Sequence, residues 1–310
     1  MKRYNSWQFG LDFIKGKDGK IYLIEINNDS TIALPAIGSK GVCVFDDSIE
    51  GIDNDVYCAK DYVKNLVPYC KKIGVDSVQF KWWWDTPNNG NMKETVEKGL
   101  AEHGITVRIG GQLSIYCYRD YVTKQNTDWF SRNKELYKKN CNIFEKVGIT
   151  TIADMGKYDE NSNYPTFVVK PTFGGGGSGV EFYKQAEKIE KKEYITEKYI
   201  MGETVTETLN SINGKLVLKR HKPRLCDYRI CVLVDELGNS TYVRGHRRTS
   251  GIDLPDHLPD GKVVGEYYDA YLCNTSAVAV RNILTDEDIA FWKEIGERVG
   301  KVILKEWIRP

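Results

Sequence analysis

The stretch GLDFIKGKDGKIYLIEIN, residues 10–27, predicts a β-hairpin whose two strands both carry acidic side chains. Asp18-Gly19 is a dipeptide typical of a two-residue hairpin loop. If it forms the loop, the lysines on either side pair with each other. Counting back along both strands then places Asp12 directly opposite Glu25.

Side chains alternate between the two faces of a strand, so Asn27 is expected on the face of Glu25. The opposite face is expected to hold Tyr22, Ile24 and Ile26. Like charges directly opposite each other destabilise a sheet, and a hard divalent cation with oxygen ligands removes that penalty. Asp12, Glu25 and Asn27 are therefore candidate ligands of Mg²⁺, with Mn²⁺ as an alternative. The competing interpretation is a surface hairpin with solvated acids.

A second candidate site lies in YPTFVVKPTFGGGGSGVEF, where a strand ending in Lys170 runs into a glycine-rich loop. Glycine allows successive backbone N–H groups to form an anion cradle, and a lysine adds a point charge. The loop comprises Gly174, Gly175, Gly176, Gly177, Ser178 and Gly179. It has neither the ending of a P-loop nor the spacing of a dinucleotide-binding fingerprint. A flexible connector is the alternative.

A third signal is TEKYIMGETV, a strand followed by a Gly-Glu step. Its edge offers backbone groups to an adenine and a carboxylate to a ribose; the candidates are Glu197, Lys198, Ile200 and Glu203. Charged strand edges also protect sheets from aggregation, which is the alternative interpretation.

The composition describes a soluble globular protein of 310 residues, with 41% hydrophobic and 28% charged residues and a formal net charge of +1. This charge does not favour a nucleic-acid partner or a membrane surface. The eight cysteines form no C-x-x-C pair, which argues against a zinc site and a disulfide framework. With no signal peptide and no long apolar segment, we expect a cytoplasmic protein.

The pattern of elements divides the chain in two. Residues 43–110 alternate strand and helix signals, which favours a small parallel α/β sheet. Residues 132–147 have helical spacing. From residue 164 the strands are longer and separated by turns such as Asn213-Gly214, which favours an antiparallel α+β region with FVVK, KLVLKR, YRICVLV and STYVRG as separate strands. Thr285 is a suitable N-cap for a final amphipathic helix.

Taken together, VVKP with GGGGSG, EKYIMGE, and the hairpin resemble motifs of the ATP-grasp superfamily. The resemblance implies an α+β fold of two subdomains that grip ATP, with a small α/β domain before them. It further implies that Lys134, in a helix resembling the family's, and Lys170 bind the nucleotide. Arg229, Arg247 and Arg248, in strands resembling those that bear the family's active-site arginines, would be catalytic.

The order of the motifs differs from the usual one, because the hairpin comes first. The resemblance implies a hairpin in residues 1–40, a preceding substrate domain in 41–130 and the ATP-grasp domain in 131–310. Within the last, the lid would span about 150–205 and the rest of the C-terminal subdomain 206–310. A circular permutation, a fragment of a tandem array and a misplaced reading frame remain open; because each part occurs once, we favour permutation.

The function that the resemblance implies is an ATP- and Mg²⁺-dependent ligase, which joins a carboxylate to an amine through an acyl phosphate and releases ADP and phosphate. Its partners would be small-molecule or peptide acids and amines, and a homodimer is compatible with the sequence. The alternatives are an ATP-binding module that does not ligate, or a fragment that needs a partner chain, and a small-molecule phosphotransferase.

Overall fold

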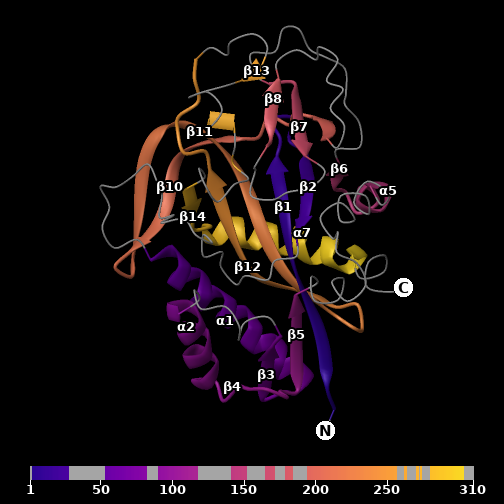
Figure 1. The fold of residues 1–310 in the computed structure, drawn as a ribbon. Coiled ribbons are helices and arrows are strands. Elements are labelled where there is room, and N and C mark those ends of the chain that lie inside the picture. Colours follow the sequence, from indigo (N-terminus) through magenta and orange to yellow (C-terminus); the bar gives the residue numbers. More distant parts are fainter. Residues whose placement is uncertain are drawn as a thin grey trace.

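The fold of the computed structural model combines a large mixed sheet with a smaller antiparallel one (Figure 1). The structure describes residues 2–27, 53–81, 90–117, 141–151, 165–171, 179–183, 194–256, 262–263, 270–271, 273 and 280–303. In these residues the large sheet has ten strands in the order β14-β12-β11-β1-β5-β3-β4, with β10 beside β11, β2 beside β1 and β6 beside β2. The four-stranded sheet has the order β13-β8-β7-β9. The expected mixed α/β architecture is therefore present.

Strand β1 (Tyr4–Lys15) is the centre of the large sheet. Along one edge it pairs antiparallel with β11 (Lys215–Asp235). Along the other edge its first half pairs parallel with β5 (Leu113–Cys117), and its second half pairs antiparallel with β2 (Ile21–Asn27). The hairpin is thereby built into the same sheet as strands from both later regions of the chain.

The hairpin has the predicted Asp12–Glu25 pair, but its loop length and the register next to the loop differ from the prediction. Its loop contains three residues, because the Gly16 N–H donates to the Lys20 carbonyl and Gly19 adopts a φ of 77°. The pairing of Lys17 with Lys20 is therefore wrong, and Lys15 pairs with Ile21 instead. A bulge next to Asp12 shifts the register by one residue and restores the expected pair.

The bulge also corrects the predicted faces of β2. Tyr22 and Ile24 pack with Ile14 in a small apolar cluster, whereas Ile26 packs into the main core on the other face. The single face predicted for all three residues is wrong, because an extra residue in the bulge interrupts the alternation of side chains.

The helices α1 (Asn54–Ile73) and α2 (Gly90–Ala101) cover part of one face of the large sheet. They pack with strands β3 (Ser77–Phe80), β4 (Thr106–Val107) and β5, which form the parallel pairs expected for this segment. The core on this face extends to Cys231 and Leu233 of β11 and Val243 of β12 (Ser240–Thr249). The β-α-β segment and the later antiparallel strands thus share one core.

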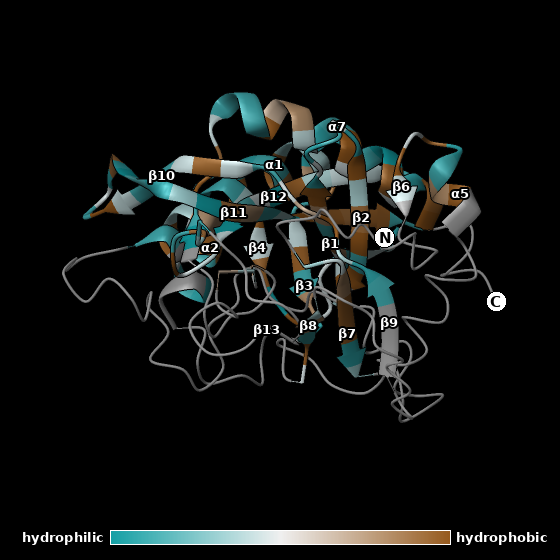
Figure 2. Ribbon diagram, turned by 90° about the horizontal axis from the view of Figure 1, so that it is seen from above, coloured by the Kyte–Doolittle hydropathy of each residue, from teal (hydrophilic) through white to brown (hydrophobic). Residues whose placement is uncertain are grey.

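Helix α7 (Asp286–Ile303) covers the opposite face, behind β1, β11 and β12 in Figure 1. Its predicted N-cap is confirmed: the Thr285 hydroxyl accepts from the Asp288 N–H at 3.2 Å, and the Asp288 carboxylate accepts from the Thr285 N–H at 3.4 Å. Trp292 of this helix is buried against Phe13 and Tyr228. The hydrophobic colouring along β1 and β2 in Figure 2 follows this core.

The segments KLVLKR and YRICVLV, predicted as separate strands, form the single 21-residue strand β11. Its first part pairs with β10 (Thr204–Ile212) through a turn in which Asn213 and Gly214 both have positive φ. Its second part pairs with β1 and β12, and β12 pairs with β14 (Val280–Asn282). The predicted antiparallel region is thus continuous with the hairpin.

The smaller sheet consists of β7 (Phe167–Pro171), β8 (Glu181–Tyr183), β9 (Tyr194–Lys198) and β13 (Lys262–Val263). The remaining described elements are α5 (Cys141–Glu145) and β6 (Thr150–Thr151). Of the helix predicted for 132–147, only the part from residue 141 lies in the described residues. Among the helices of the described residues, none is long and apolar enough to cross a membrane.

Candidate functional site

The candidate site begins with four polar side chains that line up across four strands. The register pairs Glu25 of β2 with Asp12 of β1, Asp12 with Arg229 of β11, and Arg229 with His246 of β12. Directly opposed residues of neighbouring strands project from the same face of a sheet. The fold therefore builds a row of two carboxylates, one guanidinium and one imidazole from residues that are far apart in the sequence. We call Glu25, Asp12, Arg229 and His246 the row.

Asp12 is the most strongly engaged member of this row. Its carboxylate is 0% exposed and accepts from Arg229 Nε and Nη2, both at 2.6 Å. Arg248 Nη2 lies 3.1 Å from Asp12 Oδ1, and Arg248 also donates to both oxygens of Asp227 at 2.7 and 2.9 Å. Two buried arginines and two buried aspartates thus form one charge-balanced network.

The pKa values of the two aspartates in this network are shifted in opposite directions. Burial raises the pKa of Asp12, but the charges and hydrogen bonds of Arg229 and Arg248 outweigh it and lower that pKa overall. Burial is also the largest influence on Asp227, where Arg248 opposes it and the charge of Asp12 adds to it, so its pKa rises to about 6. Asp12 therefore stays ionised to lower pH than Asp227.

Lys170 reaches this acidic end of the row from the smaller sheet. It forms an ion pair with Glu197 of β9 at 2.9 Å. Burial lowers the pKa of Lys170, but the charges of Glu197, Glu25 and Asp12 together raise it. The structure therefore brings the predicted lysine of the glycine-loop strand close to the predicted metal-binding acids.

The segment after β9 contacts the hairpin directly. Ile200 packs in one apolar cluster with Tyr22 and Ile24, and Ile14 lies against it. The Lys17 N–H donates to the Met201 carbonyl at 3.1 Å. Ile14 is two positions from Asp12 on β1, so the two side chains share a face. The predicted adenine-binding segment thus lies on the hairpin face that carries Asp12.

Glu203 and Arg247 are placed on the other side of the sheet. The Glu203 carboxylate accepts from the Tyr228 hydroxyl and lies 3.2 Å from the Lys15 ammonium. Tyr228 packs on Trp292 of α7, and Arg247 is paired with Tyr228 in the register while its Nη2 donates to the Glu207 carbonyl at 2.7 Å. Neither side chain joins the row in this structure.

Of the other predicted site residues, some lie in the described part of the chain and some outside it. Lys198 is exposed on β9, Asn27 is opposite Gly10 in the register, and Gly179 has a φ of 73°. Outside the described residues lie Lys134, Gly174, Gly175, Gly176, Gly177 and Ser178.

Sequence reasoning missed two members of the site, Asp227 and His246. Each is two positions from a predicted arginine, Arg229 and Arg248 respectively, and therefore shares its face of the strand. His246 is 2% exposed, and neither ring nitrogen has a hydrogen-bond partner within the described part of the chain. Alternation along β11 was the signal that could have identified Asp227, whereas His246 also required the register of β12 on β11.

The acids of the row suit a magnesium ion in their chemistry. Asp12 and Glu25 present carboxylates from opposed positions, and hard divalent cations prefer such oxygen ligands. A bound cation would share Asp12 with two guanidinium groups. In the described ranges, no group of three or more His, Cys, Asp or Glu side chains is arranged to hold a metal ion.

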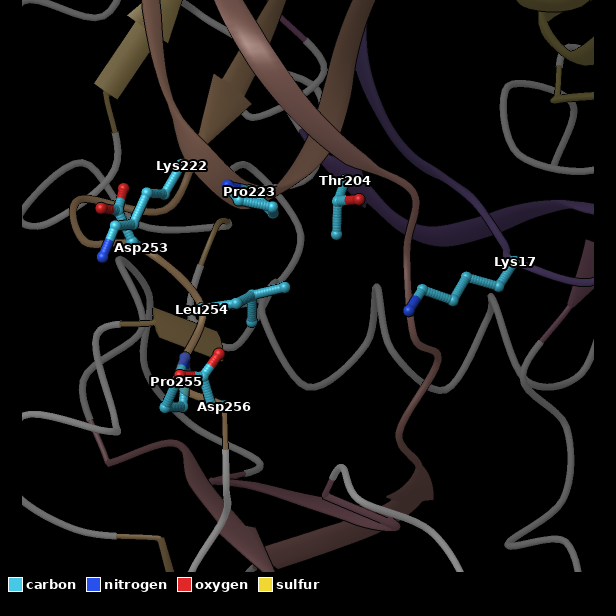
Figure 3. Close-up of a pocket in the computed structure, with 8 residues that line it drawn as sticks. All are labelled: Lys17, Thr204, Lys222, Pro223, Asp253, Leu254, Pro255 and Asp256. Carbon is cyan, nitrogen blue, oxygen red and sulfur yellow. The ribbon is translucent and has the colours of Figure 1, made fainter.

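A separate pocket of about 590 Å³ lies between the hairpin loop and the start of the β10–β11 ribbon (Figure 3). It is lined by Lys17, Thr204, Lys222, Pro223, Asp253, Leu254, Pro255 and Asp256. Two lysines and two aspartates give this lining no net charge of either sign, and none of the four residues of the row lines it.

No protein-family model and no curated protein matches the chain. Among solved structures, it is similar to a glutathione synthetase-like effector from Globodera pallida in its apo form. That match has 11% identity and a TM-score of 0.42, and it covers 80% of this chain and 74% of the other. A putative γ-glutamylcysteine synthetase from Methylobacillus flagellatus matches with 9% identity and a TM-score of 0.45, covering 95% and 87%. These similarities are too low to assign a family or an activity.

Proposed function

We propose that the chain is an ATP- and Mg²⁺-dependent ligase of the ATP-grasp type that joins a carboxylate to an amine. The observation that carries the proposal is that Lys170, paired with Glu197 at 2.9 Å, lies within reach of the charges of Glu25 and Asp12, which are opposed to each other in the row. A lysine for phosphate, acids for a metal ion and arginines for developing negative charge are the parts that phosphoryl transfer requires.

In this proposal Lys170 would bind the phosphates of ATP, and Glu25 and Asp12 would hold magnesium, which would neutralise phosphate charge. The acid substrate attacks the γ-phosphorus through a carboxylate oxygen, and ADP leaves, giving an acyl phosphate. The amine then attacks the acyl carbon, phosphate leaves with the bonding electrons, and the amine loses a proton. Arg229 and Arg248 stabilise the charge on the transferred group. Ile200 and the apolar cluster around it would contact the adenine.

We further propose that the order of segments is a circular permutation of the usual one. The pairing of β1 with β11 supports this proposal, because it places the hairpin in the same sheet as the strands that carry Arg229 and Arg248. The division into a hairpin, a substrate domain and an ATP-grasp domain is part of the same proposal.

The test measures ADP release with pools of acids and amines in the presence of Mg²⁺. We expect turnover only when both a suitable acid and a suitable amine are present. Glu25→Ala should abolish it while thermal unfolding stays unchanged, because this change removes one acid of the row. Glu97→Gln, at a partly exposed position of α2, is the matched control and should keep full activity.

The other outcomes identify other functions. ADP formation with an acid or alcohol alone, without amine, would indicate a phosphotransferase. Tight ATP binding with no ADP formation across the pools would indicate a module that binds the nucleotide without ligating. Unchanged turnover in Glu25→Ala would refute the role given to the hairpin acids.

A further inference from the structure

His246 lies beside both arginines that we propose to stabilise the transferred phosphoryl group. It is directly opposite Arg229 in the register of β12 on β11. Arg248 is two positions further along β12, so its side chain projects from the same face. Neighbouring strands of a sheet are about 4.8 Å apart. A group that contacts Arg229 on this face is therefore within reach of the imidazole.

The imidazole of His246 is buried, and the protein leaves its hydrogen-bonding groups unused. The residue is 2% exposed, and no residue that the structure describes donates to or accepts from Nδ1 or Nε2. Buried polar groups are ordinarily hydrogen-bonded, because an unpartnered one costs stability. The ring nitrogens of His246 are thus candidate contacts for a bound ligand.

The ring of His246 is neutral at neutral pH. Burial has the largest effect on its pKa, and the charges of Arg244, Arg281, Arg248 and Arg229 add to this effect, so the pKa lies well below 6.5. These arginines also interact with other groups, but their charges still disfavour an imidazolium ion. A neutral imidazole has one N–H donor and one acceptor. His246 can therefore donate a hydrogen bond without carrying a charge of its own.

The surroundings of His246 favour an oxyanion over a metal ion. Arg229 stands between Asp12 and His246 in the row, so a cation at the imidazole would lie against a guanidinium group. Two aspartates balance the two guanidinium groups of the network in this structure. Asp12 would balance them less when it also binds magnesium, and an anion beside the guanidinium groups would then restore the balance. A transferred phosphoryl group is such an anion.

We propose that His246 is a catalytic residue that donates a hydrogen bond from its imidazole N–H to a non-bridging oxygen of the transferred phosphoryl group. This inference rests on the proposed ligase function. A carboxylate oxygen of the acid forms the new bond to the γ-phosphorus, and the bond from that phosphorus to the bridging oxygen breaks, leaving its electron pair on ADP. The imidazole keeps its proton throughout, and its N–H stabilises negative charge on the phosphoryl oxygens beside Arg229. His246 would thus lower the barrier to phosphoryl transfer without contributing to the binding of ADP.

The test compares a complex that resembles the transferred phosphoryl group with the nucleotide alone. Calorimetry on the full chain measures the affinity for ADP with Mg²⁺, with and without aluminium fluoride, which takes the place of the phosphoryl group. We expect aluminium fluoride to tighten binding to the wild-type protein at least about 100-fold. His246→Leu should lose about tenfold or more of this gain, while the affinity for ADP and Mg²⁺ alone stays within about twofold. His246→Gln should lose less, because its amide keeps an N–H donor.

Two further measurements separate contact with the phosphoryl group from a structural role. Proton NMR should show one imidazole N–H signal that moves when aluminium fluoride is added to the ADP complex and that is absent from both His246 variants. In steady-state assays with the acid and amine found by the pool screen, His246→Leu should lower kcat about 100-fold and leave the KM for ATP within about twofold. His103→Leu, at an exposed histidine after α2, is the matched control and should change none of these values.

The result that overturns the proposal is aluminium fluoride that tightens binding to the same extent in wild type and His246→Leu. An equal loss of affinity for ADP and Mg²⁺ alone would overturn it as well, because it would show a general effect on the nucleotide site. A raised KM for the acid with unchanged kcat would assign His246 to the acid and refute its contact with the phosphoryl group. If His246→Leu fails to fold, His246→Gln and the NMR signal carry the same comparison.

Failure of the ligase function gives a different pattern. Absence of ADP release with every pool, together with tightening by aluminium fluoride that still depends on His246, would refute the ligase and keep the contact with the phosphoryl group. ADP release that requires both acid and amine, with the wild-type kcat in His246→Leu, would refute only the role of His246.

Discussion

Replacing Asp12 by asparagine should destabilise the protein strongly, because it removes a buried counterion of two arginines. The side chain is fully buried and accepts from Arg229 at 2.6 Å through two N–H groups, with Arg248 at 3.1 Å. The network holds two positive and two negative charges, so Asp12→Asn leaves one guanidinium without a matching charge. The amide also turns an N–H₂ group toward these donors.

The size of the effect follows from this burial. Removing one partner of a buried ion pair costs about 3–5 kcal/mol, far above the roughly 0–1 kcal/mol of a surface pair. A loss of about 3 kcal/mol lowers the ratio of folded to unfolded protein more than about 100-fold. Adding Arg229→Met to Asp12→Asn removes both members of the closest pair, so the double variant should be less destabilised than the sum of the single changes.

Urea unfolding at neutral pH, followed by far-UV circular dichroism, measures these free energies. Glu207→Gln is the matched control, because it breaks a cross-strand pair with Arg220 whose side chains are 84% and 45% exposed. A loss below about 1 kcal/mol for Asp12→Asn, equal to that of the control, would refute the buried network as a source of stability.

Two further predictions concern His246 and Thr285. The folded pKa of His246 lies below its unfolded value of 6.5, so the unfolded state binds a proton below pH 6.5 that the native state does not. Stability should therefore fall by up to about 1.4 kcal/mol per pH unit below pH 6.5, and the difference from His246→Gln in urea titrations from pH 7.5 to 5 should show this slope; parallel curves would contradict it. Thr285→Ala should cost about 1 kcal/mol of unfolding free energy through loss of the cap of α7, whereas Thr285→Ser should be nearly neutral. Equal losses in the alanine and serine variants would show that the cap does not stabilise the helix.

The hairpin shows what local sequence can predict. Asp18-Gly19 located the turn, because few residues tolerate the positive φ that Gly19 adopts. The length of the loop was not predictable, since it depends on which backbone groups of Gly16 and Lys20 meet. Apolar side chains of β2 pack on both faces, so the alternation that would have revealed the bulge is absent from its sequence.

The site shows what requires the fold. Arg247 and Arg248 are adjacent, so only one of them can share a face with Arg229, and the register of β12 on β11 selects Arg248. His246 is recognised as a member of the site only once that register is known. The pairing of β1 with β5 was likewise invisible, because neither strand carries a mark of its partner in its own sequence.

The central position of β1 has a consequence for how the chain folds during synthesis. Asp12 and Arg229 are 217 residues apart, which at about 5–20 residues per second is roughly 10–40 s of translation. Through that interval β1 lacks β11 along one edge, and its apolar residues Phe9, Leu11 and Phe13 lack the core that later buries them. An unpaired apolar strand edge invites pairing with another chain. The nascent hairpin is therefore the segment that a ribosome-associated chaperone would need to shield until β11 emerges.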